Sequence, residues 1–293
     1  MELVGDPFTV LDGGLSTALE LLGHDVGGEL WTARLLLVQP NAIVEAHASY
    51  VAAGAEVLIT ASYQASVQGF ERAGASRTDA LRALTSTTRL ARAGAARTGA
   101  DVLVAASCGP YGAILADRSE YHGRYEATWG EVRRFHRERL AVLAATEPDL
   151  FAVETIPTRV EAEIVLEELL AHPGARAWVS FVCPDGTHTG GGDELAAAVT
   201  MAVGSPQVVA VGVNCTAPEH VEELLHSAGG VTDLPLIAYA NFGTPGRPPT
   251  FDDDLDARLD RWLEARARLV GGCCGVGPAS IAALADEKRR RGA

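Results

Sequence analysis

Three cysteines of this chain have the residue type and the local sequence of a metal site. Cys273 and Cys274 are adjacent in the string GGCCG (271–275), and Cys215 lies in the string VNCT (213–216). Three thiolates that converge on one ion make a zinc site whose fourth position stays open. Neighbouring residues of a strand point to opposite faces. Cys273 and Cys274 can therefore share an ion only where the backbone turns sharply, which flanking glycines permit by tolerating positive φ.

Two other interpretations of these cysteines stay open at this point. They could be buried small hydrophobic residues, or the adjacent pair could form a disulfide between neighbours. The chain has 5 cysteines, an odd number that makes a poor disulfide framework and favours a reducing compartment where thiols bind metal.

Eight short apolar runs supply the elements that must position these thiols. They span residues 9–14, 57–63, 101–109, 150–156, 177–183, 208–215, 235–241 and 267–274. Their hydrophobicity is continuous, as in parallel strands that are covered on both faces. Segments with helical spacing of apolar residues lie between them, at 40–53, 79–98, 128–146, 159–171, 192–203, 218–227 and 255–266. Pro218 and Pro278 stand where a helix start accepts proline.

This alternation predicts an α/β protein with a (β/α)₈ TIM barrel, as a single domain over residues 1–293. An open doubly wound sheet is the alternative fold, but no Gly-x-Gly-x-x-Gly turn follows the first run. Barrel active sites lie at the carboxyl ends of the strands. The residues placed there are Asp12, Glu154, Cys215, Cys273 and Cys274. Cys108 and Cys183 also end strands, and we interpret them as wall residues.

The expected chemistry follows from the charge of such a site. Zn²⁺ with three thiolates has a net charge of −1, so it polarises a substrate poorly but holds a further thiol in its deprotonated form. The natural reaction is attack of that sulfur on an activated carbon, most simply methyl transfer from a sulfonium or ammonium cation. We therefore predict no catalytic residue beyond the zinc ligands.

The remaining strand-end residues suit an amino-acid substrate. Asp12 and Glu154 would pair with its ammonium group, and Gly13 and Gly14 would offer backbone N–H groups to its carboxylate. Asp12 could instead be a turn residue ahead of the glycines, and Glu154 could form an ion pair inside the barrel. Six aromatic residues are candidates to face a methyl cation, and none is preferred: Tyr63, Tyr111, Tyr121, Tyr125, Trp129 and Phe242.

Bulk properties exclude several other classes of function. The net charge of −14 and the pI near 5.0 argue against a nucleic acid or an anionic membrane as partner. No segment approaches the about 20 consecutive apolar residues of a membrane span, so we expect a soluble cytoplasmic protein with small-molecule substrates. The oligomeric state is not predicted. The segment 111–129 is long for a loop, and is either a lid or a packed surface excursion.

The motifs resemble those of the zinc-dependent homocysteine S-methyltransferases, especially the branch that uses S-methylmethionine or S-adenosylmethionine. The similar strings are LDGG (11–14), ITASYQA (59–65), GPYGA (109–113), LAD (115–117), SEY (119–121), ETIP (154–157), VNC (213–215) and GGCC (271–274). The resemblance implies zinc on Cys215, Cys273 and Cys274, homocysteine sulfur as the exchangeable ligand, and methionine as product. It also implies that Asp12 and Glu154 hold the homocysteine amine, with Gly13 and Gly14 near its carboxylate and Asn214 supporting the site.

Two strings depart from the pattern of that branch. The usual YPNSGE after the seventh strand is YANFGT here (239–244), so Thr244 replaces an acidic residue, and the usual Arg-Thr after the cysteine pair is Gly275-Val276. These changes concern the donor half of the site. The alternatives are therefore betaine as donor, selenocysteine as acceptor, or a homocysteine-binding barrel without turnover.

Overall fold

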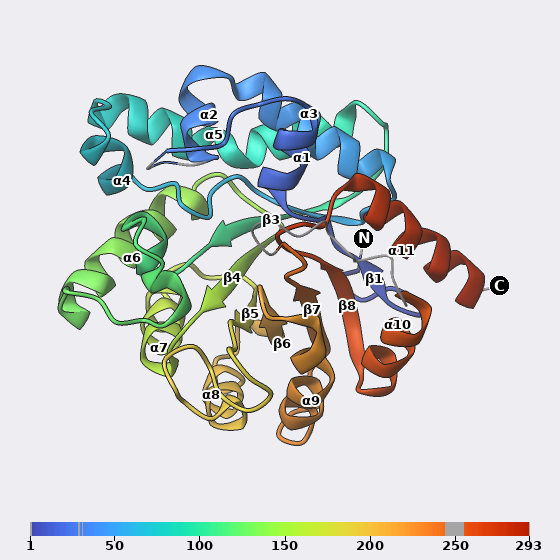
Figure 1. The fold of residues 1–293 in the computed structure, drawn as a ribbon. Helices are drawn as coiled ribbons and strands as arrows, with labels where there is room; N and C mark the ends of the chain where they lie inside the picture. The colour runs from blue at the N-terminus through green and yellow to red at the C-terminus, as the bar shows by residue number, and fades with distance from the viewer. Residues whose placement is uncertain (1, 29, 31, 244–254, 293) are drawn as a thin grey trace.

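In the computed structural model, which describes residues 2–28, 30, 32–243 and 255–292, eight parallel strands form one sheet (Figure 1). They are β1 (Thr9–Val10), β2 (Val57–Ile59), β3 (Leu103–Cys108), β4 (Leu150–Ile156), β5 (Ala177–Phe181), β6 (Val208–Asn214), β7 (Leu236–Ala240) and β8 (Ala267–Gly272). Each strand from β2 to β7 pairs with the next one in the chain, and β1 pairs with β8.

The seam between β1 and β2 closes the sheet into a barrel. Leu11 and Val57 form a parallel bridge across it. The Asp12 N–H donates to the Val57 carbonyl at 3.1 Å, and the Glu56 N–H donates to the Val10 carbonyl at 2.8 Å. The predicted (β/α)₈ barrel is therefore confirmed.

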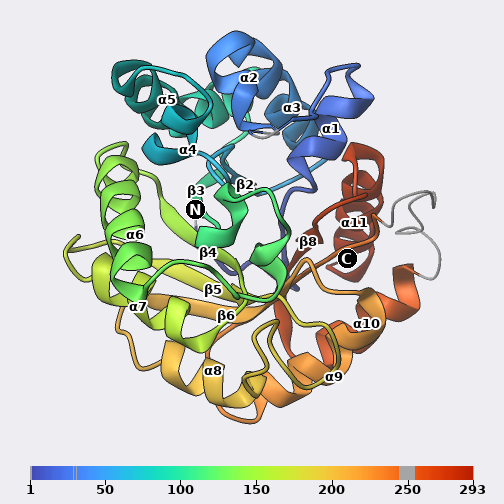
Figure 2. The same ribbon diagram turned by 60° about the vertical axis from the view of Figure 1, so that its left-hand side comes forward.

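Helices surround the barrel on its outside (Figures 1 and 2). The main ones are α3 (Pro40–Ala52), α5 (Arg77–Ala96), α6 (Trp129–Ala144), α7 (Arg159–Leu169), α8 (Leu195–Ala202), α9 (Pro218–Gly229), α10 (Leu255–Glu264) and α11 (Pro278–Arg291). The sequence did not predict the short α1 (Leu15–Leu21), α2 (Ala33–Val38) and α4 (Val67–Arg72). Each spans about two turns or fewer, which gives no repeat of apolar positions to detect.

Local signals explain where several helices begin. Thr128 and Glu131 form a capping box at the start of α6, and the Thr158 side chain accepts from the Glu161 N–H at the start of α7. These side chains satisfy N–H groups that a first helical turn leaves without partners. Prolines open α9 and α11, as the sequence predicted.

Strand residues alternate between two cores. In β4, Leu150 and Ala152 point into the barrel, whereas Phe151 and Val153 pack against the outer helices. Trp178 fills the barrel interior and donates from its Nε1 to the Tyr239 hydroxyl at 3.1 Å. The apolar filling of the barrel thus ends in a polar layer at its carboxyl end.

The long segment after β3 is a packed excursion in this structure. It contains two short 3₁₀ helices, η1 (Tyr111–Ile114) and η2 (Ser119–Tyr121). Tyr111 is buried and packs edge-on against Phe135 of α6, with ring centroids 5.2 Å apart. Among the described residues, no helix combines the length and the apolarity that crossing a bilayer needs.

Candidate metal centre

The three predicted thiols meet at the carboxyl end of the barrel. Cys215 directly follows β6, and Cys273 and Cys274 directly follow β8. Their sulfur atoms all lie within 4.8 Å of one another, and the Sγ atoms of Cys273 and Cys274 are 3.9 Å apart. Thiolates about 2.3 Å from a tetrahedral ion lie about 3.8 Å from each other. The cluster could therefore bind a metal, and the adjacent pair is not a disulfide.

A tight turn brings the adjacent cysteines together. The Val276 N–H donates to the Cys273 carbonyl at 3.2 Å, and Gly275 has a φ of +80°. This is the turn position at which glycine is favoured, because a side chain would be strained there. Cys215 also has a positive φ, of +49°. Such strain in a residue other than glycine persists only where the surrounding structure holds it, and it is common at functional sites.

Two polar side chains contact Cys215: Asn241, which the sequence did not single out, and Tyr121, one of the candidate aromatic residues. The Asn241 side-chain amide donates to its sulfur at 3.5 Å, and the Tyr121 hydroxyl lies 4.0 Å from it. Asn241 comes directly after β7, so the strand-end rule that selected the cysteines could have selected it too. Tyr121 comes from η2, and the sequence holds no signal of this contact apart from the SEY string.

The thiols cannot all ionise without a cation. Hydrogen bonds from Cys215 and Cys273 hold the pKa of the Cys274 thiol well below its ordinary value. The pKa of Cys273 is raised by its hydrogen bonds to the other two thiols and by burial. Burial and the mutual interactions of the thiols therefore oppose ionisation of all three together, and a cation between them would offset this cost.

Glu154 of β4 is a buried carboxylate at the same mouth. Its Oε2 accepts a hydrogen bond from the Tyr239 hydroxyl at 2.9 Å, and its Oε1 accepts one from the Ser107 hydroxyl. Burial raises its pKa to about 7, although both hydrogen bonds act in the opposite direction. Among the described residues it has no ion-pair partner, so the alternative of an ion pair inside the barrel finds no support.

Asp12 is a second buried carboxylate beside the first. Its Oδ2 accepts from the Ile59 N–H at 2.8 Å, which ties β1 to β2. Its Oδ1 is buried and has no hydrogen-bond partner in the described part of the chain. Burial raises the pKa of Asp12 well above its ordinary value, and the nearby charge of Glu154 adds to this. Both carboxyl groups are thus destabilised as anions until a cation arrives.

Gly13, Gly14 and Glu154 line one cavity with all three cysteines. The Gly14 N–H already donates to the Val276 carbonyl at 3.0 Å, and the Gly14 carbonyl accepts from the Tyr50 hydroxyl at 2.7 Å. A Cβ on Gly14 would lie 2.6 Å from the Cys273 carbonyl oxygen. These glycines therefore permit close packing against the cysteine turn, besides facing the cavity.

Asn214 joins two strained parts of the site. Its Oδ1 accepts from the Thr155 N–H at 2.6 Å, and its amide donates to the Thr155 hydroxyl at 2.7 Å. Thr155 has a φ of +58°, where the pairing of β4 with β5 shifts register. Since Asn214 precedes Cys215 and Thr155 follows Glu154, this contact fixes the carboxylate relative to the cysteine cluster.

The candidate aromatic residues separate into two groups. Tyr63 and Tyr121 line the cavity. Tyr125 packs edge-on between Tyr111 and Trp129, with ring centroids 5.4 and 6.4 Å away. The remaining residue, Phe242, is buried with the Arg258 guanidinium 4.9 Å above its ring. The altered Thr244 and the positions up to 254 lie outside the described residues.

Comparisons with known proteins agree with this geometry. The family model described as homocysteine S-methyltransferase matches residues 9–288. Homocysteine S-methyltransferase 4 of Zea mays is 40% identical over 96% of this chain and 89% of its own. Selenocysteine Se-methyltransferase of Brassica oleracea var. italica is 36% identical over 94% and 88%.

A solved structure extends the likeness to the fold. The metallated form of the homocysteine methyltransferase MmuM from Escherichia coli has a TM-score of 0.87 and 40% identity, over 95% of this chain and 96% of its own. The range matched by the family model, residues 9–288, includes all eight strands and the three clustered cysteines. The chain therefore belongs to the homocysteine S-methyltransferase family.

Proposed function

We propose that the protein transfers a methyl group from S-methylmethionine or S-adenosylmethionine to the thiol of homocysteine, with zinc on Cys215, Cys273 and Cys274. The observation that carries the proposal is that three thiols lie within 4.8 Å of one another in a cavity that Glu154 also lines, with the buried Asp12 near Glu154. Neither carboxyl group has an ion-pair partner among the described residues. An amino acid with a thiol side chain and a free ammonium group is complementary to the thiols and to the carboxyl groups. Zinc, when bound, would hold that thiol as a thiolate near neutral pH.

The two carboxyl groups explain how the site would recognise the ammonium group of homocysteine. Glu154 and Asp12 would pair with the homocysteine ammonium, which lowers the cost of keeping both groups ionised. Because the Gly14 N–H is already bonded to Val276, we assign the donor for the substrate carboxylate to Gly13. The role of Gly14 is then to let the backbone pack closely against the turn that contains Cys273 and Cys274.

The transfer is a direct displacement. The homocysteine sulfur forms a bond to the methyl carbon as the bond from that carbon to the donor sulfur breaks, and the donor leaves as a neutral thioether. The homocysteine thiol releases its proton to solvent before attack, so the thiolate and the sulfonium yield two neutral thioethers. Tyr63 and Tyr121 border the cavity, and aromatic faces attract a desolvated cation such as a sulfonium. Alignment and exclusion of water then supply the rate enhancement.

A donor panel tests this function directly. Purified zinc-loaded protein should form methionine from homocysteine with S-methylmethionine or S-adenosylmethionine, and faster than with betaine at equal concentration. Product is measured by mass spectrometry with a methyl-labelled donor. Faster transfer from betaine would reassign the donor, and tight homocysteine binding without transfer from any donor would indicate a binding protein without turnover.

Selenocysteine is a second candidate acceptor, since one relative is named as a selenocysteine Se-methyltransferase. The cluster fits a selenol as well as a thiol, because both ligate metals as soft anions. Competition between homocysteine and selenocysteine for a limiting labelled donor gives the ratio of the two kcat/KM values. A ratio above one for selenocysteine would make it the preferred acceptor.

Replacement of Gly14 by alanine should lower the affinity for zinc. The new Cβ would lie 2.6 Å from the Cys273 carbonyl oxygen, so the turn with both cysteines has to shift. Zinc affinity is measured by competition with a chromogenic chelator and should fall about tenfold or more. This is the smallest loss of metal affinity that is usual when groups supporting metal ligands are changed. Gly130→Ala in α6 is the control, because the nearest atom to its Cβ would be 3.9 Å away. Equal affinity in the two variants contradicts the expectation.

A further inference from the structure

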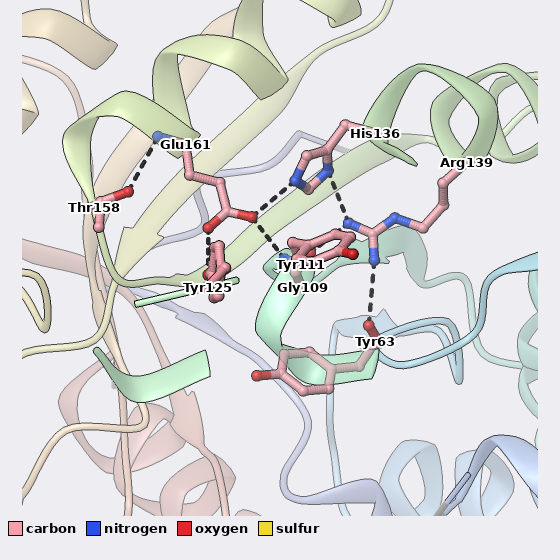
Figure 3. A network of polar contacts seen from close by, with 8 residues as sticks. All are labelled: Tyr63, Gly109, Tyr111, Tyr125, His136, Arg139, Thr158 and Glu161. Carbon is pink, nitrogen blue, oxygen red and sulfur yellow. Dashed lines mark hydrogen bonds and ion pairs between the residues drawn. The ribbon is translucent and has the colours of Figure 1, made fainter. Parts of the chain in front are cut away.

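A buried chain of charged and polar side chains lies between α6 and α7 (Figure 3). Arg139 and His136 come from α6 and Glu161 from α7, and each is at most 1% exposed. The Arg139 guanidinium donates to His136 Nδ1 at 3.1 Å, and His136 Nε2 lies 2.9 Å from a Glu161 oxygen. Arginine has donors only, so Nδ1 accepts and the proton on Nε2 faces the carboxylate. A neutral histidine thus joins a buried cation to a buried anion.

The outer ends of this network hold segments that follow β2 and β3. Glu161 accepts from the Tyr111 N–H at 2.6 Å and from the Tyr125 hydroxyl at 2.6 Å. Arg139 donates to the carbonyl of Gly109, and to that of Tyr63 at 3.4 Å. The network therefore fixes the segment 109–125 at both ends, together with the backbone of Tyr63.

The fixed parts carry two of the three aromatic side chains that line the cavity, and the third, Tyr239, belongs to β7. Tyr121 lies within the segment 109–125, with its hydroxyl 4.0 Å from the Cys215 sulfur. Tyr63 lines the same cavity. A shift of the segment would therefore move Tyr121 relative to the thiol cluster, whereas Asp12 and Glu154 belong to the barrel wall and would stay in place.

Packing of the two helices does not require a buried ion pair. Arg133 and Arg137 of α6 already bind Glu168 of α7, at 3.0 and 2.7 Å, nearer the surface. A buried ion pair is also weak evidence for stability, since desolvation offsets much of its attraction. What distinguishes the Glu161 network from the Glu168 pair is its contact with the loop segments.

We propose that Glu161, His136 and Arg139 are positioning residues that hold Tyr121 and Tyr63 over the cysteine cluster for the methyl donor. This inference rests on the proposed function, in which Tyr63 and Tyr121 border the cavity that the sulfonium donor enters. It predicts that damage to the network impairs use of the donor and leaves binding of homocysteine and zinc intact.

The test compares Glu161→Gln with Glu168→Gln, which alters the contacts of Glu168 with Arg133 and Arg137 between the same helices. Tyr125→Phe is a milder second variant, since it removes the tyrosine hydroxyl that donates to Glu161 and keeps the aromatic ring. Arg139 is left unchanged because its charge also lowers the pKa of Glu154. Zinc content, the KM for homocysteine, kcat/KM for the donor and amide hydrogen exchange of residues 109–125 are measured for each protein.

In Glu161→Gln we expect kcat/KM for the donor to fall about tenfold, the usual scale for a lost hydrogen bond to a charged group, and exchange of 109–125 to rise by a similar factor. Tyr125→Phe should change both in the same direction by a smaller factor, because it removes one of the three hydrogen bonds to Glu161 and keeps the charge of the carboxylate. The homocysteine KM and zinc content should stay at wild-type values in both variants, and Glu168→Gln should match wild type throughout.

Equal donor kinetics in Glu161→Gln and Glu168→Gln would overturn the proposal, as would a parallel loss of homocysteine binding. If Glu161→Gln does not fold, Tyr125→Phe decides alone by the same criteria. If the wild-type protein transfers no methyl group, the proposed function fails separately. Exchange of 109–125 then decides the positioning role: faster exchange confined to Glu161→Gln and Tyr125→Phe supports it, and unchanged exchange refutes it.

Discussion

Cys215→Ala will lose bound zinc and methyl transfer together, with the barrel still folded. Cys215 supplies one of three sulfur atoms within 4.8 Å of one another, and two thiols alone fall short of the three protein ligands that a catalytic zinc site uses. The rate should fall by more than about 100-fold, beyond the effect of losing a group that only orients a ligand. Alanine keeps the Cβ, so backbone strain at this positive φ changes little. Metal is measured by mass spectrometry, and folding by circular dichroism.

Cys183→Ala is the matched control for this result. Cys183 is also a buried cysteine, just past the end of β5, but it is not part of the cluster. Its loss should leave zinc content and rate near wild type. Cys273→Ala and Cys274→Ala should behave like Cys215→Ala. Full activity in metal-free protein, or equal zinc loss in the Cys183 variant, would show that the cluster is not the metal site.

Glu154→Gln will weaken homocysteine binding and at the same time stabilise the substrate-free protein above neutral pH. The lost charge-assisted contact with the ammonium group should cost about 1 to 3 kcal/mol of binding free energy, measured by calorimetry. The stability gain has a separate origin. Burial raises the pKa of this carboxyl from 4.5 to about 7, so its ionised form opposes folding by about 3 kcal/mol at most.

The sign of the pH dependence follows from that shift. Between about pH 4.5 and pH 7 the folded protein keeps a proton on Glu154 that the unfolded chain has released, so the stability of the wild type falls as pH rises through this window. Above pH 7 the full difference from Glu154→Gln should appear, and below pH 4.5 the two proteins should converge. Urea unfolding of metal-free protein at several pH values measures this.

Glu168→Gln gives the opposite sign and serves as a control. Hydrogen bonds from Arg137 hold the pKa of Glu168 below its ordinary value, so this carboxylate stabilises the fold at neutral pH and loses its effect as pH falls through the lowered pKa. Its substitution should therefore destabilise the protein slightly at pH 8. If Glu154→Gln is also less stable than wild type at pH 8, the ionised Glu154 does not oppose folding. Burial then does not raise the pKa of Glu154.

The sequence by itself determined the fold and the location of the chemistry. Continuous apolar runs alternating with helical segments require parallel strands covered on both faces, and a closed barrel of that kind gathers its strand ends at one mouth. Residues such as Asp12, Glu154 and Cys215 could therefore be grouped although more than 200 positions separate the first from the last. The order of motifs gave the family, and local glycines explained how Cys273 and Cys274 face one point.

The tertiary structure alone decided what surrounds those groups. The orphan Oδ1 of Asp12 and the raised pKa of Glu154 depend on burial, which neither residue type nor spacing fixes. Tyr121 reaches Cys215 from 94 positions away, and Arg139 reaches the carbonyl of Tyr63 across 76. Such contacts arise where loops of different strands pack together. A single sequence holds periodic signals for strands and helices, but none for side chains that meet across irregular loops.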